Sequence, residues 1–382
     1  MGTSPVLCVA DAGLAGEILR NEQGIWSAAN PGDAMVDELA ILDDAQHREV
    51  RALFQRVFDA DSIDGYLRLA DPLVDAAIER WLTRGRVHFK REVVRLMKRV
   101  TARALLGARG VADAEWLARA LAWVCAGRGA VLPPWLSPKA IRARLAYAGL
   151  RGALSKRTAA GSADLLGRLR AAARDAGFHD DERLLRLFLS VVVGAVETTA
   201  SAMASMGYLL AKHEPWQERL RDEARDAGLA PVTCAGGRRL ELARCTWNES
   251  MRLFPVAPHV PRRARRTTRV GGADVPAGTG VLVMLTTLWS DPAWWSEPDG
   301  FDPDRFSAAR AEDRRRKGLF LPFGAGAHAC IGMQLATAQA LSFWHAMLTR
   351  CRFSLAPGYD AHHTFSPMGM VSGDVRLAVK PA

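Results

Sequence analysis

The sequence predicts a mainly α-helical fold with a small β-rich region. Segments of helical length with periodic apolar residues recur along most of the 382-residue chain. The longest, residues 180–213, is apolar on every side through its middle, as expected of a helix buried in a core. Alternating apolar residues and turn glycines are concentrated in residues 256–289, which predicts strands there.

In the first half of the chain, predicted helices alternate with irregular segments. Residues 6–10 predict a short strand, and glycine and proline interrupt residues 22–42 and 127–138, which predicts loops. Helices are predicted at residues 14–21, 44–58, 72–83, 91–106, 139–156 and 163–176.

The long helix at residues 180–213 has signals at both ends. Acidic residues 180–182 suit the positive end of the helix dipole, Lys212 suits the negative end, and Pro215 stops the helix. A second helix, residues 240–254, also ends before a proline.

The last third of the chain mixes strand, irregular and helical patterns. Residues 281–285 predict a strand, and the paired glycines after Val270 predict a turn. Residues 290–318 contain several prolines and many charges, which predicts an irregular meander. A final helix is predicted over the apolar segment 331–348, directly after Cys330.

The stretch from Phe323 to Gly332 is the strongest signal in the chain. Its sequence, Phe-Gly-Ala-Gly-Ala-His-Ala-Cys-Ile-Gly, places Cys330 where the next helix begins. Glycines let a backbone fold tightly against a flat partner, and a helix N-terminus favours an anion, so Cys330 is placed to be a thiolate. A haem iron takes such a thiolate as its fifth ligand. The alternative is a buried structural cysteine beside a turn.

Four fixed positions, Phe323, Gly326, Cys330 and Gly332, resemble the haem-binding loop of the cytochrome P-450 family. The resemblance extends along nearly the whole chain. It implies a cytochrome P-450 fold, with the long central helix over a buried haem b, in a single domain over residues 1–382 that is shortened at its N-terminus. It also implies an oxidoreductase, a haem-thiolate monooxygenase with Cys330 as the iron ligand.

Glu249 and Arg252 lie three residues apart on a predicted helix and therefore share a face. Such pairs are common on surfaces, where they contribute little to stability. The resemblance gives this pair a structural role, because it implies a Glu-x-x-Arg pair and a second arginine, matched by Arg305, that together hold the thiolate loop. Removing one partner of a buried ion pair costs roughly 3–5 kcal/mol.

Glu197 and Thr198 lie in the middle of the long apolar helix, where a carboxylate is costly without a purpose. Threonine can bond back to the helix carbonyl, so one interpretation is a satisfied polar pair that bends the helix. The resemblance implies instead the catalytic acid–alcohol pair above the haem. In that case Gly194 and Ala195 leave room for dioxygen, Thr198 holds water, and Glu197 relays protons from solvent.

The resemblance also implies cations that hold the haem propionates. His47 and Arg51 lie one helical turn apart on one face, and Arg262 and His328 match two further positions. The implied haem contacts are His47, Arg51, Ala195, Arg262, Phe323, His328, Cys330 and Gly332.

The same resemblance implies that five stretches line the substrate pocket. They are residues 22–42, residues 127–140, Val192, Val193 and Val196 of the long helix, residues 256–260 and residues 365–370. Most of these residues are apolar, and His259 is the polar side chain expected to reach a substrate. We therefore expect a medium-sized, mainly apolar substrate of the secondary-metabolite class, either free or attached to a carrier. The residues expected in the pocket are Val192, Val193, Val196, Val256, His259 and Met368.

The net charge of +10 indicates either a solvated basic surface or a docking face for an acidic partner. Basic residues 314–317 lie just before the cysteine loop, where the resemblance implies that electrons enter. We therefore expect electrons from NAD(P)H through a reductase and an acidic ferredoxin. Because no recognisable nucleic-acid module accompanies the charge, we expect no nucleic-acid partner.

The sequence has no run of 18 or more apolar residues and no basic-then-apolar leader, so we expect a cytoplasmic protein without a membrane anchor. The six cysteines are far apart and form no CxxC pair, which argues against a disulfide framework or a zinc site. The arginine- and alanine-rich composition favours a bacterial source, and we expect a monomer.

Two alternatives remain open from the sequence. One is a haem-thiolate enzyme of another reaction type, such as peroxide-driven oxidation, isomerisation or dehydration, and Glu197 and Thr198 argue against it. The other is a non-catalytic haem-containing interaction protein, to which the short N-terminus gives some weight.

Overall fold

The structure, a computed structural model, is mainly helical with small sheets, as the sequence predicts. It describes residues 6–28, 39, 42, 44–127, 137–156, 164–228, 232–364 and 369–382. The helices are α1 (Ala12–Arg20), α2 (Asp44–Gln55), α3 (Ala60–Arg84), α4 (Phe89–Ala104), α5 (Val111–Gly127), α6 (Pro138–Ser155), α7 (Leu165–Asp175), α8 (Asp181–Lys212), α9 (Glu214–Asp226), α10 (Glu241–Leu253), α11 (Leu285–Trp289) and α12 (Met333–Arg350). Short 3₁₀ segments are η1 (Gly236–Arg239), η2 (Pro303–Phe306), η3 (Glu312–Arg314) and η4 (Gly326–His328). The strands are β1 (Val6–Val9), β2 (Trp26–Ser27), β3 (Arg86–His88), β4 (His259–Ala264), β5 (Thr268–Val270), β6 (Ala273–Val275), β7 (Gly280–Met284), β8 (Cys351–Leu355), β9 (His363–Thr364), β10 (Met370–Val371) and β11 (Arg376–Pro381).

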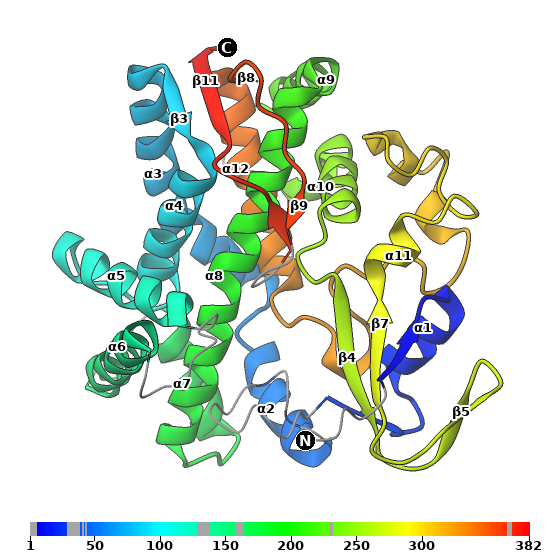
Figure 1. The fold of residues 1–382 in the computed structure, drawn as a ribbon. Coiled ribbons are helices and arrows are strands. Elements are labelled where there is room, and N and C mark those ends of the chain that lie inside the picture. The colour runs from blue at the N-terminus through cyan, green and yellow to red at the C-terminus, as the bar shows by residue number, and fades with distance from the viewer. Residues whose placement is uncertain are drawn as a thin grey trace.

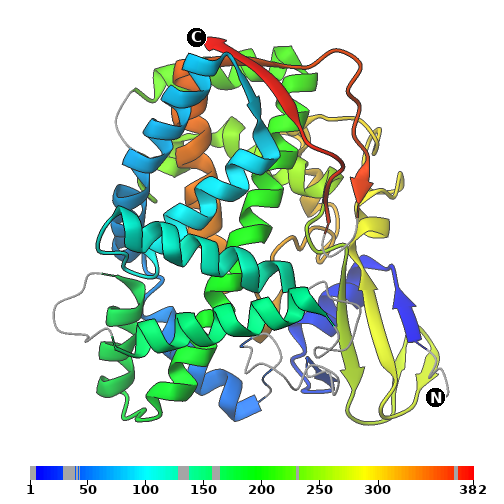
Figure 2. The same ribbon diagram turned by 60° about the vertical axis from the view of Figure 1, so that its left-hand side comes forward.

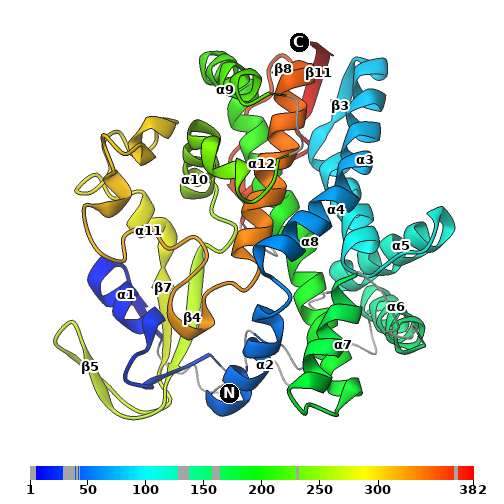
Figure 3. The same cartoon turned by 180° about the vertical axis from the view of Figure 1, so that it is seen from behind.

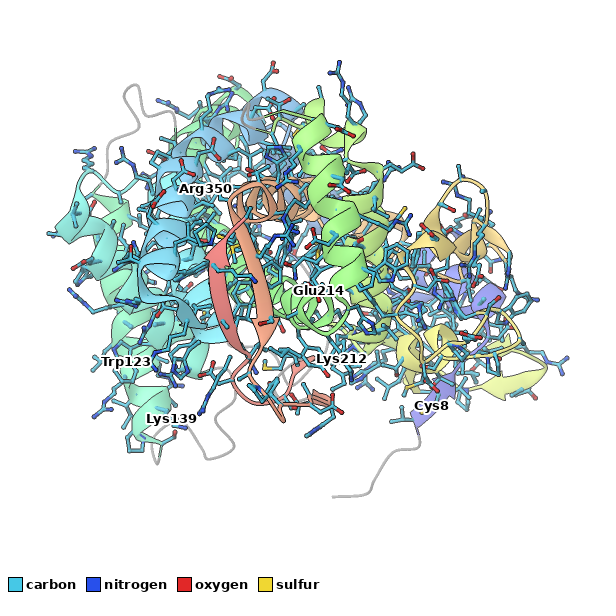
Figure 4. All side chains as sticks on the ribbon, turned by 90° about the horizontal axis from the view of Figure 1, so that it is seen from above. Cys8, Trp123, Lys139, Lys212, Glu214 and Arg350 are labelled. Atoms are coloured by element: carbon cyan, nitrogen blue, oxygen red, sulfur yellow. The ribbon has the colours of Figure 1, made fainter. Side chains whose placement is uncertain are left out.

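The elements form two unequal parts (Figures 1 and 3). The larger part holds most of the helices, with α8 running through it, and the smaller part holds α1 and a four-stranded sheet. That sheet has the order β1-β7-β4-β2, in which β1 and β7 are parallel and the other pairs are antiparallel. Figure 4 shows the same division from above, with Trp123 of α5 and Cys8 of β1 toward opposite ends of the molecule.

A second sheet ties the C-terminus to the helical part. β11 pairs antiparallel with β3, which follows α3, and with β8, which follows α12. Figure 2 shows this sheet at the end of the molecule where the C-terminus lies. The sheet therefore fixes α3 and α12 relative to each other, although they are far apart in sequence.

α8 crosses the helical part as a largely buried helix. The Asp180 side chain accepts a hydrogen bond from the backbone N–H of Arg183 at 2.8 Å, which caps the first turn. By length and composition alone this helix could cross a membrane, but 67% of its most apolar window is buried inside the protein. That burial is typical of a core helix.

One proline differs from its predicted role, and another has a second role besides the predicted one, since α8 ends before Pro215 as expected. The sequence predicts that a helix begins at Pro72, but α3 begins at Ala60 and runs through this proline. The start of α3 is fixed by Asp59, which accepts a hydrogen bond from the Ser62 N–H at 2.8 Å. Pro215 lies in the first turn of α9, where a missing N–H costs nothing, so a second helix follows α8 almost at once.

Three hydrophobic clusters make up the core of the described residues. The first packs α3, α4, α8, α10 and α12 around Trp81 and Trp344, and the second surrounds Phe188 nearer the start of α8. The third lies under the four-stranded sheet and contains Trp289 and Trp295. α8 passes from the second cluster to the first at residues 197–199, the level of the predicted acid–alcohol pair.

Candidate functional site

A cavity of about 680 Å³ lies between α8, the loop before α12 and the four-stranded sheet. α2, α10 and α11 also contribute to its walls. Most of the lining side chains are apolar or small, and the volume lies in the range of small-molecule and cofactor sites. The charged and imidazole residues that line it are His47, Arg51, Arg262, Arg263 and His328.

The loop from Phe323 to Gly332 forms one wall of this cavity. The backbone N–H of Cys330 donates a hydrogen bond to the carbonyl oxygen of Phe323 at 2.7 Å, which closes the loop. Gly326 has a φ of +69°, and a Cβ there would lie 2.5 Å from the carbonyl oxygen of Arg20. Glycine is therefore required for the loop to pack against the end of α1.

The Cys330 side chain lines the cavity, so its exposed surface faces that internal space. Burial raises the pKa of the Cys330 thiol, although the backbone N–H groups of Gly332 and Met333 and the charge of Arg51 act in the opposite direction. The sequence predicts that the helix begins at Cys330, but α12 begins three residues later, at Met333, so the end of the helix favours the thiolate less strongly than burial opposes it. A metal ion bound to the Cys330 sulfur would favour the thiolate, since a coordinating thiol is deprotonated.

The four predicted propionate residues all line the same cavity. His47 is only 2% exposed, and its ring stacks on the His328 ring with centroids 4.0 Å apart. Arg51 lies one turn further along α2, where burial lowers its pKa and the nearby Cys330 raises it. Arg262 reaches the cavity from β4. Guanidinium groups therefore reach the cavity from both the helix and the sheet walls, and imidazole rings reach it from the helix and the loop.

α8 turns small and polar residues toward the cavity. Gly194, Ala195 and Thr198 line it, and the Thr198 hydroxyl donates a hydrogen bond to the Gly194 carbonyl at 2.7 Å. Glu197 does not line it, because its Oε1 lies 4.0 Å from the Nζ of Lys98 on α4. The alcohol therefore faces the cavity, and the acid beside it faces α4.

Three of the valines that the sequence analysis expects in the pocket do not lie on the cavity wall. Val192, Val193 and Val196 are buried in the second hydrophobic cluster and do not line the cavity. Ser190 and Val191 line it instead, at helical spacing from the small residues further along α8. Because the middle of α8 is apolar on all sides, its sequence pattern does not show which side faces the cavity.

The sequence places two more pocket residues near β4, and only one of them lines the cavity. Val256 lines it, whereas His259 does not. His259 is exposed at the first residue of β4, opposite Met284 of β7, and thus lies outside the cavity walls where the sequence analysis expects it. Met368, the last predicted pocket residue, lies outside the described residues.

The second part of the chain matches a known family. The sequence model of the cytochrome P450 family matches residues 153–380, which is more than half of the chain. The chain belongs to the cytochrome P450 family. This P450 is therefore an oxidoreductase, a monooxygenase that holds a haem iron through a cysteine thiolate.

Similarity to other P450s extends over nearly the whole chain. Cyclooctatin synthase of Streptomyces melanosporofaciens is 30% identical over 361 residues, which cover 89% of this chain and 77% of that protein. Cytochrome P450 136 of Mycobacterium tuberculosis is 28% identical over 355 residues, which cover 90% of this chain and 72% of that protein. Among solved structures, retinoic acid-bound cyanobacterial CYP120A1 has a TM-score of 0.89 and 21% identity, covering 99% of this chain and 90% of that one.

The residues on the walls of this P450 cavity fit a haem, which combines an iron, a flat apolar ring and carboxylates. Cys330 offers a sulfur ligand, Phe323 and Ala195 offer apolar surface, and Arg51 and Arg262 offer positive charge. The chemistry of this donor set matches the three parts of the cofactor.

Outside the cavity, a buried ion-pair network holds the meander of this P450 to α10. Glu249, Arg252 and Arg305 are each at most 2% exposed. Arg252 donates to the two carboxylate oxygens of Glu249 at 2.7 and 2.9 Å, and the Nε of Arg305 donates to Glu249 at 3.0 Å. Both arginines also donate to the carbonyl of Gly300 at 3.2 Å. The structure thus brings together the three residues that the sequence singles out.

Glu312 is a fourth member of this network, and the sequence pattern does not predict it. Its buried carboxylate accepts hydrogen bonds from Arg305 at 3.0 Å and from Arg310 at 2.7 Å. Burial alone would raise its pKa, but the hydrogen bonds from Arg310 and Ser296 outweigh this effect and lower the pKa of Glu312 to about 2. An acid in an irregular, charge-rich segment has no periodicity that marks it as buried.

Proposed function

We propose that this P450 inserts one atom of dioxygen into a C–H bond or double bond of a medium-sized, mainly apolar molecule of the secondary-metabolite class. One observation carries the proposal: the Cys330 side chain and the Thr198 face of α8 line the same, mostly apolar cavity. A structure of closely similar fold is described as bound to retinoic acid, itself a mainly apolar molecule.

In this proposal Cys330 is the thiolate ligand, and His47, Arg51, Arg262 and His328 bind the haem propionates. The haem supplies the activation of dioxygen, which protein side chains do not provide. The chain itself fixes the sulfur through the hydrogen bond that closes the cysteine loop. The buried network around Glu249 holds the meander that precedes this loop.

We infer that Thr198 and Glu197 manage the protons of the reaction. Oxygenation of a C–H bond consumes dioxygen, two electrons and two protons, and it yields an alcohol and water. Because the Thr198 hydroxyl donates to the Gly194 carbonyl, its oxygen is left to accept a hydrogen bond from water in the cavity. Glu197 exchanges protons with solvent on the α4 side, near Lys98, and passes them toward the cavity.

We infer that electrons reach this P450 from NAD(P)H through a reductase and an acidic ferredoxin. Arg314 and Lys317, in the basic segment before the cysteine loop, are exposed and suit such a partner. The neighbouring Arg315 donates to a backbone carbonyl at 2.6 Å, and Arg316 binds the aspartate ahead of α1 at 3.2 Å. The positive charge available to a docking partner therefore comes mainly from Arg314 and Lys317.

We also infer a monomeric, cytoplasmic protein of bacterial origin. Relatives along nearly the whole chain come from Mycobacterium tuberculosis and Streptomyces melanosporofaciens, both bacteria. A substrate that is free and one that is attached to a carrier both agree with the apolar cavity walls.

The variant Cys330→Ala tests the proposal. The wild-type protein, reduced and exposed to carbon monoxide, should show the strongly red-shifted Soret band of a thiolate-ligated haem, and the variant should lose it. Cys351→Ala, which removes another cysteine in the same part of the chain, should keep the band. A red-shifted band that persists in Cys330→Ala would show that another residue is the ligand.

A further inference from the structure

A second hollow, separate from the catalytic cavity, lies on the surface between α4 and α5. Its volume is about 710 Å³. α4 forms one wall, α5 forms the other, and Gly373 and Asp374 close one end. We call this hollow the α4–α5 groove. The two helices that form its walls lie across the molecule from β5 (Figures 1 and 3).

α4 turns two rows of positive charge toward the α4–α5 groove, because helix residues four apart share a face. Of the described residues that line the groove, six are cations and two, Glu115 and Asp374, are acids. The lining therefore has a clear excess of positive charge. The cations are Lys90, Arg91, Arg95, Lys98, Arg99 and Arg119.

The arginines at the rim are only weakly neutralised by the protein's own carboxylates. Arg99 and Arg119 share Glu115, and each lies 3.9 Å from it. Arg91 lies 3.7 Å from Asp374. These separations are too long for hydrogen bonds, so the guanidinium donors are available to the oxygens of a ligand.

Two less exposed lysines lie deeper in the groove. The Lys98 side chain is 14% exposed, and its carboxylate partner, Glu197, is 4.0 Å away. Lys90 donates a hydrogen bond to the carbonyl of Val371 at 2.7 Å, and burial lowers the pKa of Lys90. Both ammonium groups have lost much of their water without gaining a carboxylate at hydrogen-bond distance, which favours an added anion.

The opposite wall leaves room for a ligand. Ala118 and Ala122 of α5 face the groove four residues apart, so this side contributes small side chains. Arg95 donates to Glu92 at 2.6 Å and is therefore less available than the other cations. The remaining guanidinium groups come from both helices, and planar guanidinium groups suit the oxygens of a phosphate.

We propose that the α4–α5 groove binds a small molecule that carries a phosphate or diphosphate group. The site rests on residues that the proposed monooxygenase reaction does not use, apart from the contact between Lys98 and Glu197. Through that contact, an anion in the groove competes with Glu197 for the Lys98 ammonium.

Calorimetric titration with inorganic pyrophosphate, at a fixed ionic strength of about 0.15 M, tests the proposal. The wild-type protein should bind it saturably at one site. Arg99→Gln and Arg119→Gln should each weaken binding by about tenfold, because each removes a charge-assisted hydrogen bond. Glu115→Gln should tighten binding, because it removes a competing carboxylate.

The matched control is Arg269→Gln, which removes one positive charge from β5, where Arg269 is exposed and lies 3.2 Å from Asp274. It should bind pyrophosphate as the wild type does. Absence of saturable binding, or an equal loss of affinity in Arg269→Gln and Arg99→Gln, would overturn the proposal.

Thermal unfolding gives a second measurement on the same proteins. Pyrophosphate should raise the melting temperature of the wild type and of Arg269→Gln, and should raise it less in Arg99→Gln and Arg119→Gln. Melting without pyrophosphate checks that each variant is folded. Neither measurement needs a substrate or an electron donor. Anion binding in the α4–α5 groove can therefore be confirmed or refuted independently of the proposed monooxygenase function, which the carbon monoxide experiment tests.

Discussion

At the level of single residues, Thr198 and Thr199 are adjacent on α8 and both line the cavity. The predicted acid–alcohol pair consists of Glu197 and Thr198, and Thr199 is not part of it. We expect Thr198→Ala to lower the productive rate by about a hundredfold, the lower end of what a positioned proton-transfer group contributes. NAD(P)H oxidation should continue, and its electrons should leave as peroxide. The measurement is product and peroxide formed per NAD(P)H oxidised.

Two variants make this test specific to the hydroxyl of Thr198. Thr198→Ser keeps a hydroxyl and should recover most of the coupling, and Thr199→Ala should stay coupled. Equal uncoupling in Thr198→Ala and Thr199→Ala would indicate a loss of packing above the cavity instead of a loss of proton delivery.

Alanine substitutions at Gly324 and Gly326 distinguish the cost of a positive φ in the cysteine loop from the cost of a steric clash. Both have φ near +70°, but a Cβ on Gly324 would come no closer than 3.8 Å to another atom, whereas one on Gly326 would lie 2.5 Å from the Arg20 carbonyl. Gly324→Ala should therefore cost about 1–2 kcal/mol of stability, the cost of a left-handed alanine. Gly326→Ala should cost clearly more and should retain less haem. Urea unfolding and haem content after purification measure the two effects.

At the level of elements, the sequence predicts helices well where apolar residues recur with a clear phase or where a cap marks the end. α8 illustrates both the success and the limit. Its length and burial follow from its composition, but the face that meets the cavity does not, because valine occurs on the buried side as well. Proline is ambiguous in a similar way, since Pro72 lies inside α3 and Pro215 lies in the first turn of α9.

In the candidate site, too, the sequence predicts some residues and misses others. The glycines and Cys330 are marked by their spacing, because a tight loop needs glycine at particular positions. Arg305 is found only through the resemblance, and Glu312 is not found, because ion pairs in irregular segments depend on tertiary contacts that leave no local pattern. His259 is misplaced for the opposite reason: its residue type suggests chemistry, but the pairing of β4 leaves it exposed.

The network that joins α10 to the meander should make stability depend on pH. The pKa of Glu312 is lowered to about 2, below its usual value of 4.5, so its contribution is fully present above about pH 4.5 and is lost as the pH falls toward 2. We expect Glu312→Gln to be destabilised by roughly 3 kcal/mol at pH 7, because Arg305 and Arg310 lose a buried partner. The difference from wild type should shrink as the pH falls from 5 to 3.

Urea unfolding midpoints, measured at several pH values in that range, follow this difference. Glu22→Gln serves as a control, because the Glu22 side chain is 79% exposed and lies 3.5 Å from Arg20. Its unfolding midpoint should run parallel to that of the wild type at every pH. A Glu312→Gln midpoint that also runs parallel would mean that the pKa of Glu312 is the same in the folded and the unfolded protein.

At the level of the whole molecule, α1 connects the basic segment to the cysteine loop. Arg316 binds Asp11 at the start of α1, and the end of α1 packs against Gly326. A partner that docks on Arg314 and Lys317 is therefore held close to the loop that carries Cys330. If the proposed docking on Arg314 and Lys317 holds, electrons enter on that side and the rate is sensitive to salt, because exposed charges are screened within about 10 Å at 0.1 M.

We therefore expect the double variant Arg314→Gln, Lys317→Gln to be reduced by an acidic ferredoxin about tenfold more slowly than wild type at low salt. The two rates should converge as salt increases, because screening removes the advantage that the positive charges give. The measurement is the stopped-flow rate of haem reduction at several ionic strengths. Arg91→Gln, Arg99→Gln has the same net charge as this variant but is altered on the α4–α5 groove. If it slows reduction equally, the overall charge of +10 governs the encounter and the basic segment is not the docking face.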